Sequence, residues 1–270
     1  MKIAFIGDIV GRPGRKIIKD NLKKLKDEYS IDYIIANGEN ASHGFGLTVK
    51  NCDELLKSGI NIITGGNHSF DKKGDMIKLL STNSVLRPYN YAQGVPGKGI
   101  YIHNIEDEKI AIINLMGIYG MPIVDNPFNM IEKIVDDLKS QGVNNIFIDF
   151  HAQATSEKRV LAKLLEGKVS AICGTHTHVG TDDLQICDGT FYLTDIGLTG
   201  CRDNIIGMDK KVPIEKLKTG IGSHFDVPNS CKSILQLAII DIQNGRSIDG
   251  FKIKIFNDRE DRIISKAIIE

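Results

Sequence analysis

Residues 1–40 read MKIAFIGDIVGRPGRKIIKDNLKKLKDEYSIDYIIANGEN and contain the pattern that decides the fold. The apolar run Lys2 to Gly7 is typical of a strand, and Gly14 to Glu28 carries apolar residues along one side of a helix. Tyr33 to Asn37 is a second short apolar run, and Asp8 and Glu39 follow the two runs. This order predicts a β-α-β unit, in which helices pack on a sheet of parallel strands.

The alternation of strands and helices continues after residue 40. Further strands are predicted at Ile60 to Thr64, Asn145 to Phe150 and Val169 to Gly174, and helices at Val49 to Ser58, Lys73 to Leu80, Asn126 to Lys139 and Ser156 to Leu165. Asp188-Gly189 and Asn244-Gly245 predict hairpins, as does the turn Glu106-Asp107-Glu108. A long loop is expected between Gly197 and Pro228. The order predicts an α/β fold with a largely parallel first sheet and an antiparallel second one, layered between helices.

Composition indicates an ordinary globular chain. With 270 residues, 41% hydrophobic and 25% charged, residues 1–270 are expected to form a single domain. Lys and Arg (34) equal Asp and Glu (34), so no net field draws the whole molecule to nucleic acid or a membrane. The sequence shows no basic stripe and has few aromatics (6%, no Trp), which argues against an extended nucleic-acid groove. This composition does not argue against binding of a short RNA end.

Cysteine usage and the chain start bear on the compartment. The cysteines are odd in number and far apart, and they form no C-x-x-C pair; they are Cys52, Cys173, Cys187, Cys201 and Cys231. This pattern favours reduced thiols and a cytoplasmic protein. Asp8 interrupts the first apolar run, so no signal peptide is expected, and no stretch is apolar enough for a transmembrane helix.

Side chains that bind metals follow successive predicted strands. Each of them alone is common in a plain turn, but His is not a turn residue and several of the seven histidines stand here. Because ligands of such sheets lie at the carboxyl ends of the strands, the joint occurrence predicts a metal site there. His176 and His178 are expected to point to the same side of extended backbone, and Glu39 has the reach to bridge two ions. The set is Asp8, Glu39-Asn40, Asn67-His68, His151, and His176 with His178.

Five segments resemble motifs of the calcineurin-like metallophosphoesterases: GDIVG (7–11), GEN (38–40), GGNH (65–68), DFHA (149–152) and GTHTH (174–178). That superfamily usually has His where this chain has Val10, and Asp where it has Glu39. At the position of Ser69 the superfamily usually has Asp or Glu. With GDIVGRPGR (7–15) and HAQATSEK (151–158), the combination resembles the YmdB-type phosphodiesterases over essentially the whole chain.

The resemblance implies a layered α/β/β/α sandwich of two mixed sheets flanked by helices. It also implies two divalent metal ions, with iron or manganese suggested by the family and compatible with oxygen and imidazole donors. One ion would be held by Asp8, Glu39, Asn40 and His178, and the other by Glu39, Asn67, His151 and His176. Asn40 would compensate for the missing His at Val10.

These residues predict a metal-dependent phosphodiesterase. A metal-bridged hydroxide would attack the phosphate, and His68 would protonate the leaving oxygen; orienting a ligand is the alternative role for His68. Two divalent ions, two carboxylates and one hydroxide leave about one positive charge, which a phosphodiester anion would neutralise. The resemblance suggests nucleotide substrates of the 2′,3′-cyclic type.

Alternatives and partners remain open at this stage. A phosphomonoesterase or nucleotidase, or a non-catalytic metal- or nucleotide-binding regulatory protein, would fit the same motifs. Arg12, His43 and His224 are candidate substrate contacts, although solvent exposure or a plain loop position also suits them. The expected partner is a small phosphodiester or nucleotide, with RNA ends and a homo-oligomer left open and no membrane partner.

Overall fold

The computed structural model of the protein describes residues 1–105 and 107–270. One sheet consists of β1 (Lys2–Ile6), β2 (Tyr33–Asn37), β3 (Ile62–Thr64), β10 (Gly200–Cys201), β11 (Ser233–Gln243), β12 (Arg246–Phe256) and β13 (Ile263–Lys266). Its strand order is β13-β12-β11-β1-β2-β3, with β10 paired to β11. In this sheet β1, β2 and β3 are parallel, whereas β11 runs antiparallel to β1.

The second sheet is also mixed. It consists of β4 (Ile100–Ile105), β5 (Glu108–Met116), β6 (Asn145–His151), β7 (Ala171–Thr175), β8 (Gln185–Cys187), β9 (Thr190–Leu193) and β14 (Ile268–Ile269). The strand order is β14-β8-β9-β7-β6-β5-β4. Strands β5, β6, β7 and β9 are parallel, β4 is antiparallel to β5, and β8 is antiparallel to β9 but parallel to β14.

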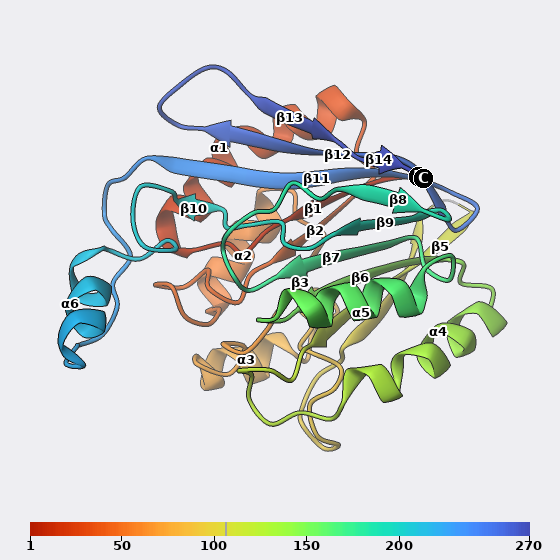
Figure 1. The fold of residues 1–270 in the computed structure, drawn as a ribbon, viewed down its shortest axis with the longest axis horizontal. Helices are drawn as coiled ribbons and strands as arrows, with labels where there is room; N and C mark the ends of the chain where they lie inside the picture. Colours follow the sequence, from red (N-terminus) through yellow and green to blue (C-terminus); the bar gives the residue numbers. More distant parts are fainter. Residues whose placement is uncertain (106) are drawn as a thin grey trace.

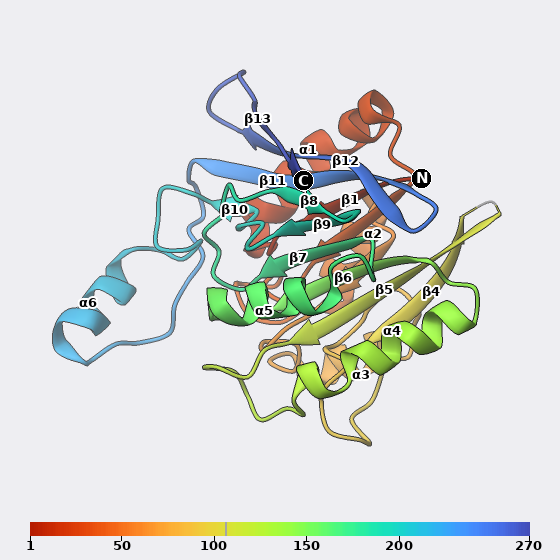
Figure 2. The same cartoon turned by 45° about the vertical axis from the view of Figure 1, so that its right-hand side comes forward.

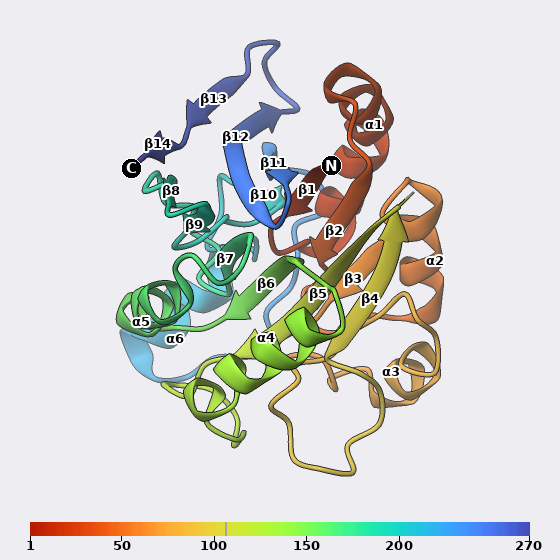
Figure 3. The same ribbon diagram turned by 90° about the vertical axis from the view of Figure 1, so that its right-hand side faces the viewer.

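The two sheets face one another and helices cover their outer faces (Figures 1 and 3). Helices α1 (Gly11–Tyr29), α2 (Val49–Lys57) and α3 (Lys73–Leu79) pack on the first sheet, and α4 (Ile131–Ser140) and α5 (Thr155–Leu165) on the second. Between the sheets lies an apolar layer that includes Phe5 and Phe147, whose ring centroids are 4.9 Å apart. The α/β/β/α sandwich of two mixed sheets is therefore confirmed.

The prediction of one parallel and one antiparallel sheet was wrong. The hairpin β11–β12 covers the free edge of β1, and β8 and β9 extend the sheet that contains β7. Both sheets thus combine early and late segments of the chain. Local sequence patterns identify a strand but carry no signal for a partner more than 200 residues away.

Two further predictions need correction. The segment between Gly197 and Pro228 is more than a loop, because it holds β10 and helix α6 (Lys211–Thr219), which projects from the body of the molecule (Figure 2). Cys201 and Cys231 form a disulfide across this segment, so the prediction of reduced thiols was wrong for this pair. The two cysteines meet because the chain leaves and re-enters the sheet at the paired strands β10 and β11.

Other elements differ only at their ends. The helix predicted from Asn126 begins with a short 3-10 turn, η1 (Pro127–Asn129), followed by α4. Strands β4 and β5 form the predicted hairpin, although the turn predicted at Glu106 lies outside the described residues. Among residues 1–105 and 107–270, no helix has the length and apolar character needed to cross a membrane.

Candidate metal centre

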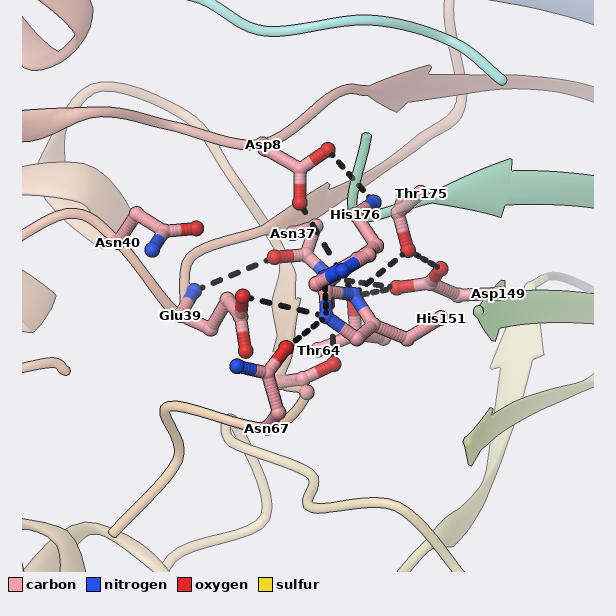
Figure 4. A network of polar contacts seen from close by, with 12 residues as sticks. Asp8, Asn37, Glu39, Asn40, Thr64, Asn67, Asp149, His151, Thr175 and His176 are labelled. Carbon is pink, nitrogen blue, oxygen red and sulfur yellow. Dashed lines mark hydrogen bonds and ion pairs between the residues drawn. The ribbon is translucent and has the colours of Figure 1, made fainter. Parts of the chain in front are cut away.

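The carboxyl ends of strands from both sheets meet at one edge of the sandwich. Figure 4 shows the polar side chains that converge there from β1, β2, β3, β6 and β7. Direct contacts join the two sheets at this edge: the backbone N–H of His176 donates to Asp8 Oδ2 (3.2 Å), and Asn37 Nδ2 donates to Asp149 (2.9 Å). The sheet geometry therefore brings together residues that are up to 168 positions apart in the sequence.

One group of donor atoms surrounds the Nε2 atom of His151. Asn67 Oδ1 lies 2.8 Å from it, His176 Nδ1 3.1 Å and Glu39 Oε1 3.2 Å. Ligand atoms that share one ion at about 2.1 Å lie roughly 3 to 3.5 Å from one another, and the three distances from His151 Nε2 agree with this spacing. The ligand atoms of Glu39, His151 and His176 all lie within 4.8 Å of one another. Together with Asn67 they are the four residues that the family resemblance assigns to one ion.

The charges within this group show that it is suited to a cation. Burial would raise the pKa of Glu39, but His151 outweighs burial and lowers it to about 2. Burial would lower the pKa of His151, but Glu39 raises it to about 8. Burial and the neighbouring His151 lower the pKa of His176 to about 3. The pocket thus favours one positive charge at the centre of the four donors, which a proton on His151 or a metal ion can supply.

A second group adjoins the first through Glu39. His178 Nε2 lies 3.3 Å from Asn40 Oδ1, and the amide of Asn40 is held by a hydrogen bond from Nδ2 to the carbonyl of Gly44 (2.9 Å). Asp8 is fully buried, which raises its pKa, and its Oδ1 has no hydrogen-bond partner among the residues that the structure describes. A buried carboxylate oxygen without a partner is costly, so this atom fits a cation ligand.

Each histidine of the site uses one ring nitrogen to fix its orientation. His151 Nδ1 lies 3.0 Å from Thr175 Oγ1, His178 Nδ1 donates to the carbonyl of Ile206 (2.8 Å), and His176 Nε2 donates to Gln153 Oε1 (2.8 Å). The other nitrogen of each ring is then left with its lone pair facing the donor groups. Histidines that bind metals are held in this way, with the distal N–H donated to a neighbouring oxygen.

Thr175 connects His151 to a buried carboxylate. Its hydroxyl donates to Asp149 Oδ1 (2.7 Å) and accepts from the Nδ1–H of His151. Asp149 also accepts hydrogen bonds from Asn37 and Thr64, and its burial raises its pKa to about 6. A chain of hydrogen bonds from Asp149 through Thr175 therefore sets which nitrogen of His151 carries its proton.

Thr175→Val tests this chain. Valine keeps the shape of threonine but removes the acceptor of the His151 N–H, and we expect the dissociation constant for the metal to rise about 10- to 100-fold. Calorimetric titration of the ion-free protein with Mn²⁺ measures the change. Thr155→Val, at an exposed position of α5, is the matched control. An unchanged affinity in folded Thr175→Val would show that the hydroxyl does not orient His151.

His68 lies beside the donor groups without joining them. Its backbone N–H donates to Glu39 Oε2 (2.8 Å), and its ring Nδ1 lies 2.7 Å from Asp71 Oδ2. Asp71 thus supplies the carboxylate that the superfamily usually places directly after the His, where this chain has Ser69. Ser69 instead bonds to Gly66 within the loop. His68 therefore has an acidic partner, although this chain has Ser69 where the superfamily usually has Asp or Glu.

The cavity over the donor groups has both polar and apolar lining residues. Its volume is about 360 Å³, and it is lined by Glu39, Asn40, Phe45, His68, Gln153, His176, Thr177, His178, Ile206, Met208 and Phe225. Beside the polar donors, Phe45, Met208 and Phe225 pack together in one apolar cluster and form an apolar wall. Among these described lining residues there is no Lys or Arg, so any ion provides the positive charge that an anionic substrate meets.

The three predicted substrate contacts lie outside this cavity. Arg12 and His43 line a neighbouring cavity beside α1 and α2. The ring of His224 packs against Phe45, with centroids 5.6 Å apart, and His224 itself does not line the cavity. Sequence reasoning missed Phe45, Phe225 and Asp71. Another lining residue, Gln153, was indicated by the sequence, because it belongs to the motif HAQATSEK that begins at His151.

The geometry expected for the GTHTH segment was wrong. β7 ends at Thr175, and His176 (φ 100°) and His178 (φ 64°) adopt left-handed backbone conformations instead of extended ones. Both rings still line the cavity. Hydrogen bonds from Thr177 N–H and hydroxyl to Asp195, which is itself paired with the buried Lys158 (2.8 Å), hold this strained turn in place.

Comparison with known proteins shows that the fold is that of the metallophosphoesterases. A 5′-nucleotidase precursor from Thermus thermophilus shares the fold alone, with a TM-score of 0.56 at 12% identity over 99% of this chain and 54% of that one. A phosphatase from Mycoplasma pneumoniae has a TM-score of 0.88 at 34% identity, covering 95% of this chain and 93% of that one.

The sequence comparisons narrow the class. The family described as YmdB-like protein matches residues 4–252, and this chain belongs to that family. A 2′,3′-cyclic-nucleotide 2′-phosphodiesterase from Bacillus subtilis (strain 168) is 43% identical over 245 residues, which cover 90% of this chain and 92% of that protein. The resemblance inferred from the motifs is thus confirmed.

Proposed function

We propose that the protein hydrolyses 2′,3′-cyclic nucleotides with two divalent metal ions. One ion is held by Asp8, Glu39, Asn40 and His178, and the other by Glu39, Asn67, His151 and His176. The observation that carries the proposal is the orientation of the three histidines: the free nitrogens of His151 and His176 lie in one group with Glu39, and that of His178 lies in the adjoining group beside Asn40. The unpartnered Oδ1 of the buried Asp8 supports a second ion beside it.

Iron or manganese is the proposed occupant. The cytoplasm is the proposed compartment, which the three free cysteines Cys52, Cys173 and Cys187 support despite the disulfide. The donors are oxygen and imidazole nitrogen without thiolate, a set that suits iron and manganese and leaves the choice to metal availability. When bound, the pair of ions supplies a nucleophilic water at neutral pH and positive charge for the phosphate oxygens.

His68 is the proposed general acid. Its ring lies at the cavity and is 29% exposed, and its Nδ1 is engaged by Asp71, so Nε2 is free to face the leaving oxygen. A proton delivered there avoids release of an alkoxide, which is a poor leaving group. Asp71 fixes the orientation of the ring.

The charge of the cavity favours a diester over a monoester. A monoester dianion would need cationic side chains in addition to the ions, and the described lining residues contain none. The wall of Phe45, Phe225, Ile206 and Met208 offers an apolar surface of the kind on which a nucleobase stacks. The Bacillus subtilis relative named as a 2′,3′-cyclic-nucleotide 2′-phosphodiesterase supports this substrate class. The same cyclic phosphate at the 3′ end of an RNA chain is included in the proposal.

The decisive experiment is a substrate panel with protein reconstituted with Mn²⁺ or Fe²⁺. We expect 2′,3′-cyclic AMP to be hydrolysed faster than adenosine monophosphates. Faster hydrolysis of the monophosphates would instead indicate a nucleotidase. Absence of hydrolysis of every ester by fully loaded protein would indicate a binding protein without turnover.

Phe45→Leu tests the stacking wall. Leucine keeps an apolar side chain but removes the flat ring, and we expect the KM for 2′,3′-cyclic AMP to rise about 10-fold with little change in kcat. Phe70→Leu is the matched control, because Phe70 packs against Tyr91 outside the cavity lining. Equal KM values for Phe45→Leu and the unchanged protein would remove Phe45 from the substrate site.

A further inference from the structure

A basic groove runs between α1 and α2, outside the candidate metal centre. Two adjoining cavities of about 480 and 1140 Å³ form it, and they share Glu54 and Lys57 as lining residues. We call it the α1–α2 groove and define it by its cationic lining residues Arg12, Arg15, Lys19, Lys23, Lys26, Lys50 and Lys57.

The helix geometry collects these cations on one side. Arg12, Arg15, Lys19 and Lys26 are separated by three, four and seven residues, which places them along one face of α1. In the sequence, acidic residues such as Asp20 alternate with the lysines, so the stripe was not visible there. It stands out in a chain whose formal net charge is zero.

Most of these charges are free to meet an anion. Asp53, Glu54 and Asp75 also line the groove, and Glu54 is paired with Arg15 at 2.8 Å. Lys23 lies 3.6 Å from Asp27. Over the described part of the chain, no carboxylate lies within ion-pair distance of the remaining five cations; these are Arg12, Lys19, Lys26, Lys50 and Lys57.

The groove leads to the candidate metal centre. α1 and α2 both begin near the donors in the sequence, since α1 starts three residues after Asp8 and α2 nine residues after Asn40. The loop of residues 41–46 separates the groove from the site: His43 lines the groove cavity, and Phe45 lines the cavity of the metal centre. A linear polymer that is bound in the groove reaches the metal centre by crossing this loop.

We propose that the α1–α2 groove binds single-stranded RNA whose 3′-terminal cyclic phosphate enters the metal centre. This inference rests on the proposed function, because the cyclic phosphate needs the 2′-hydroxyl of a ribose. The stretch from Arg12 to Lys26 is about 21 Å long, which accommodates a few nucleotides. Repeated cations on flexible stems over the apolar Leu22 and Ile34 suit a phosphate backbone without sequence readout.

The test is a triple variant, Lys19→Ala/Lys26→Ala/Lys57→Ala, in the metal-loaded protein. Its matched control, Lys24→Ala/Lys133→Ala/Lys139→Ala, removes the same charge from exposed positions outside the groove. Fluorescence anisotropy measures binding of a labelled ten-nucleotide RNA that ends in a 2′,3′-cyclic phosphate. We expect the groove variant to bind about 30- to 100-fold more weakly at 0.1 M salt, with a salt slope about 2 units shallower.

Hydrolysis of 2′,3′-cyclic AMP separates this inference from the proposed function. The groove variant is expected to retain mononucleotide turnover while it loses RNA binding. Equal RNA binding by the two triple variants would overturn the groove, even if mononucleotide hydrolysis is normal. A further comparison uses an RNA with a plain 3′-hydroxyl and an acidic peptide. If the groove variant lost binding of both to the same extent, the groove would be a general anion surface, and the proposal would be overturned.

Discussion

Glu39→Gln is expected to lower the hydrolysis of 2′,3′-cyclic AMP by about 10³-fold or more and to leave fewer than two metal ions per chain. Glu39 is the one carboxylate shared by both proposed ion sites, and its Oε1 lies 3.2 Å from His151 Nε2. Glutamine has nearly the same shape but removes the negative charge that holds two cations close together. Elemental analysis and initial rates on the same preparation measure both effects.

The matched control for this variant is Glu157→Gln. Glu157 is also buried, but it lies on α5 and accepts hydrogen bonds from the backbone of the loop after β5. It is expected to retain two ions and most of the activity. A Glu39→Gln protein with two ions and normal turnover would contradict the bridging role.

His68→Ala is expected to lower kcat about 10²- to 10⁴-fold while the protein retains two metal ions, because it removes the proposed proton donor and no ligand. The loss depends on the leaving group. A p-nitrophenyl diester releases a stable phenolate that needs little protonation, so its hydrolysis should fall much less. Asp71→Asn keeps the ring but removes its carboxylate partner, and an intermediate loss is expected.

His103→Gln is the control for His68→Ala, since His103 lies on β4 and packs against Tyr33, far from the cavity lining. Equal losses for the aryl and nucleotide substrates would indicate that His68 positions the substrate and does not donate a proton. Loss of metal together with activity would assign His68 to ligand orientation.

The sequence indicated which donor residues lie together, and their roles as metal ligands stay a prediction. Donor residues after successive strands were visible because parallel strands deliver their carboxyl ends to one edge. The left-handed turns at His176 and His178 were not visible, since they depend on hydrogen bonds from Thr177 to the distant Asp195. The residues that orient the ligands, Thr175 and Asp149, look like ordinary strand residues in the sequence.

The same limit explains the errors in the fold. Helices α1 and α2 were predicted because their periodicity is local, whereas the pairing of β11 with β1 depends on residues more than 200 positions apart. The disulfide between Cys201 and Cys231 likewise depends on how β10 pairs with β11, and their spacing in the sequence gives no indication of it. Val10, where the superfamily usually has a metal-binding His, packs with Leu198 and Met208 in an apolar cluster.

The most direct test of two cooperating ions is a titration of ion-free protein with Mn²⁺ while bound metal and hydrolysis of 2′,3′-cyclic AMP are followed together. The account predicts two ions per chain at saturation, with activity that rises as the second ion binds. Full activity with one ion per chain, or two bound ions without hydrolysis of any phosphodiester, would contradict it.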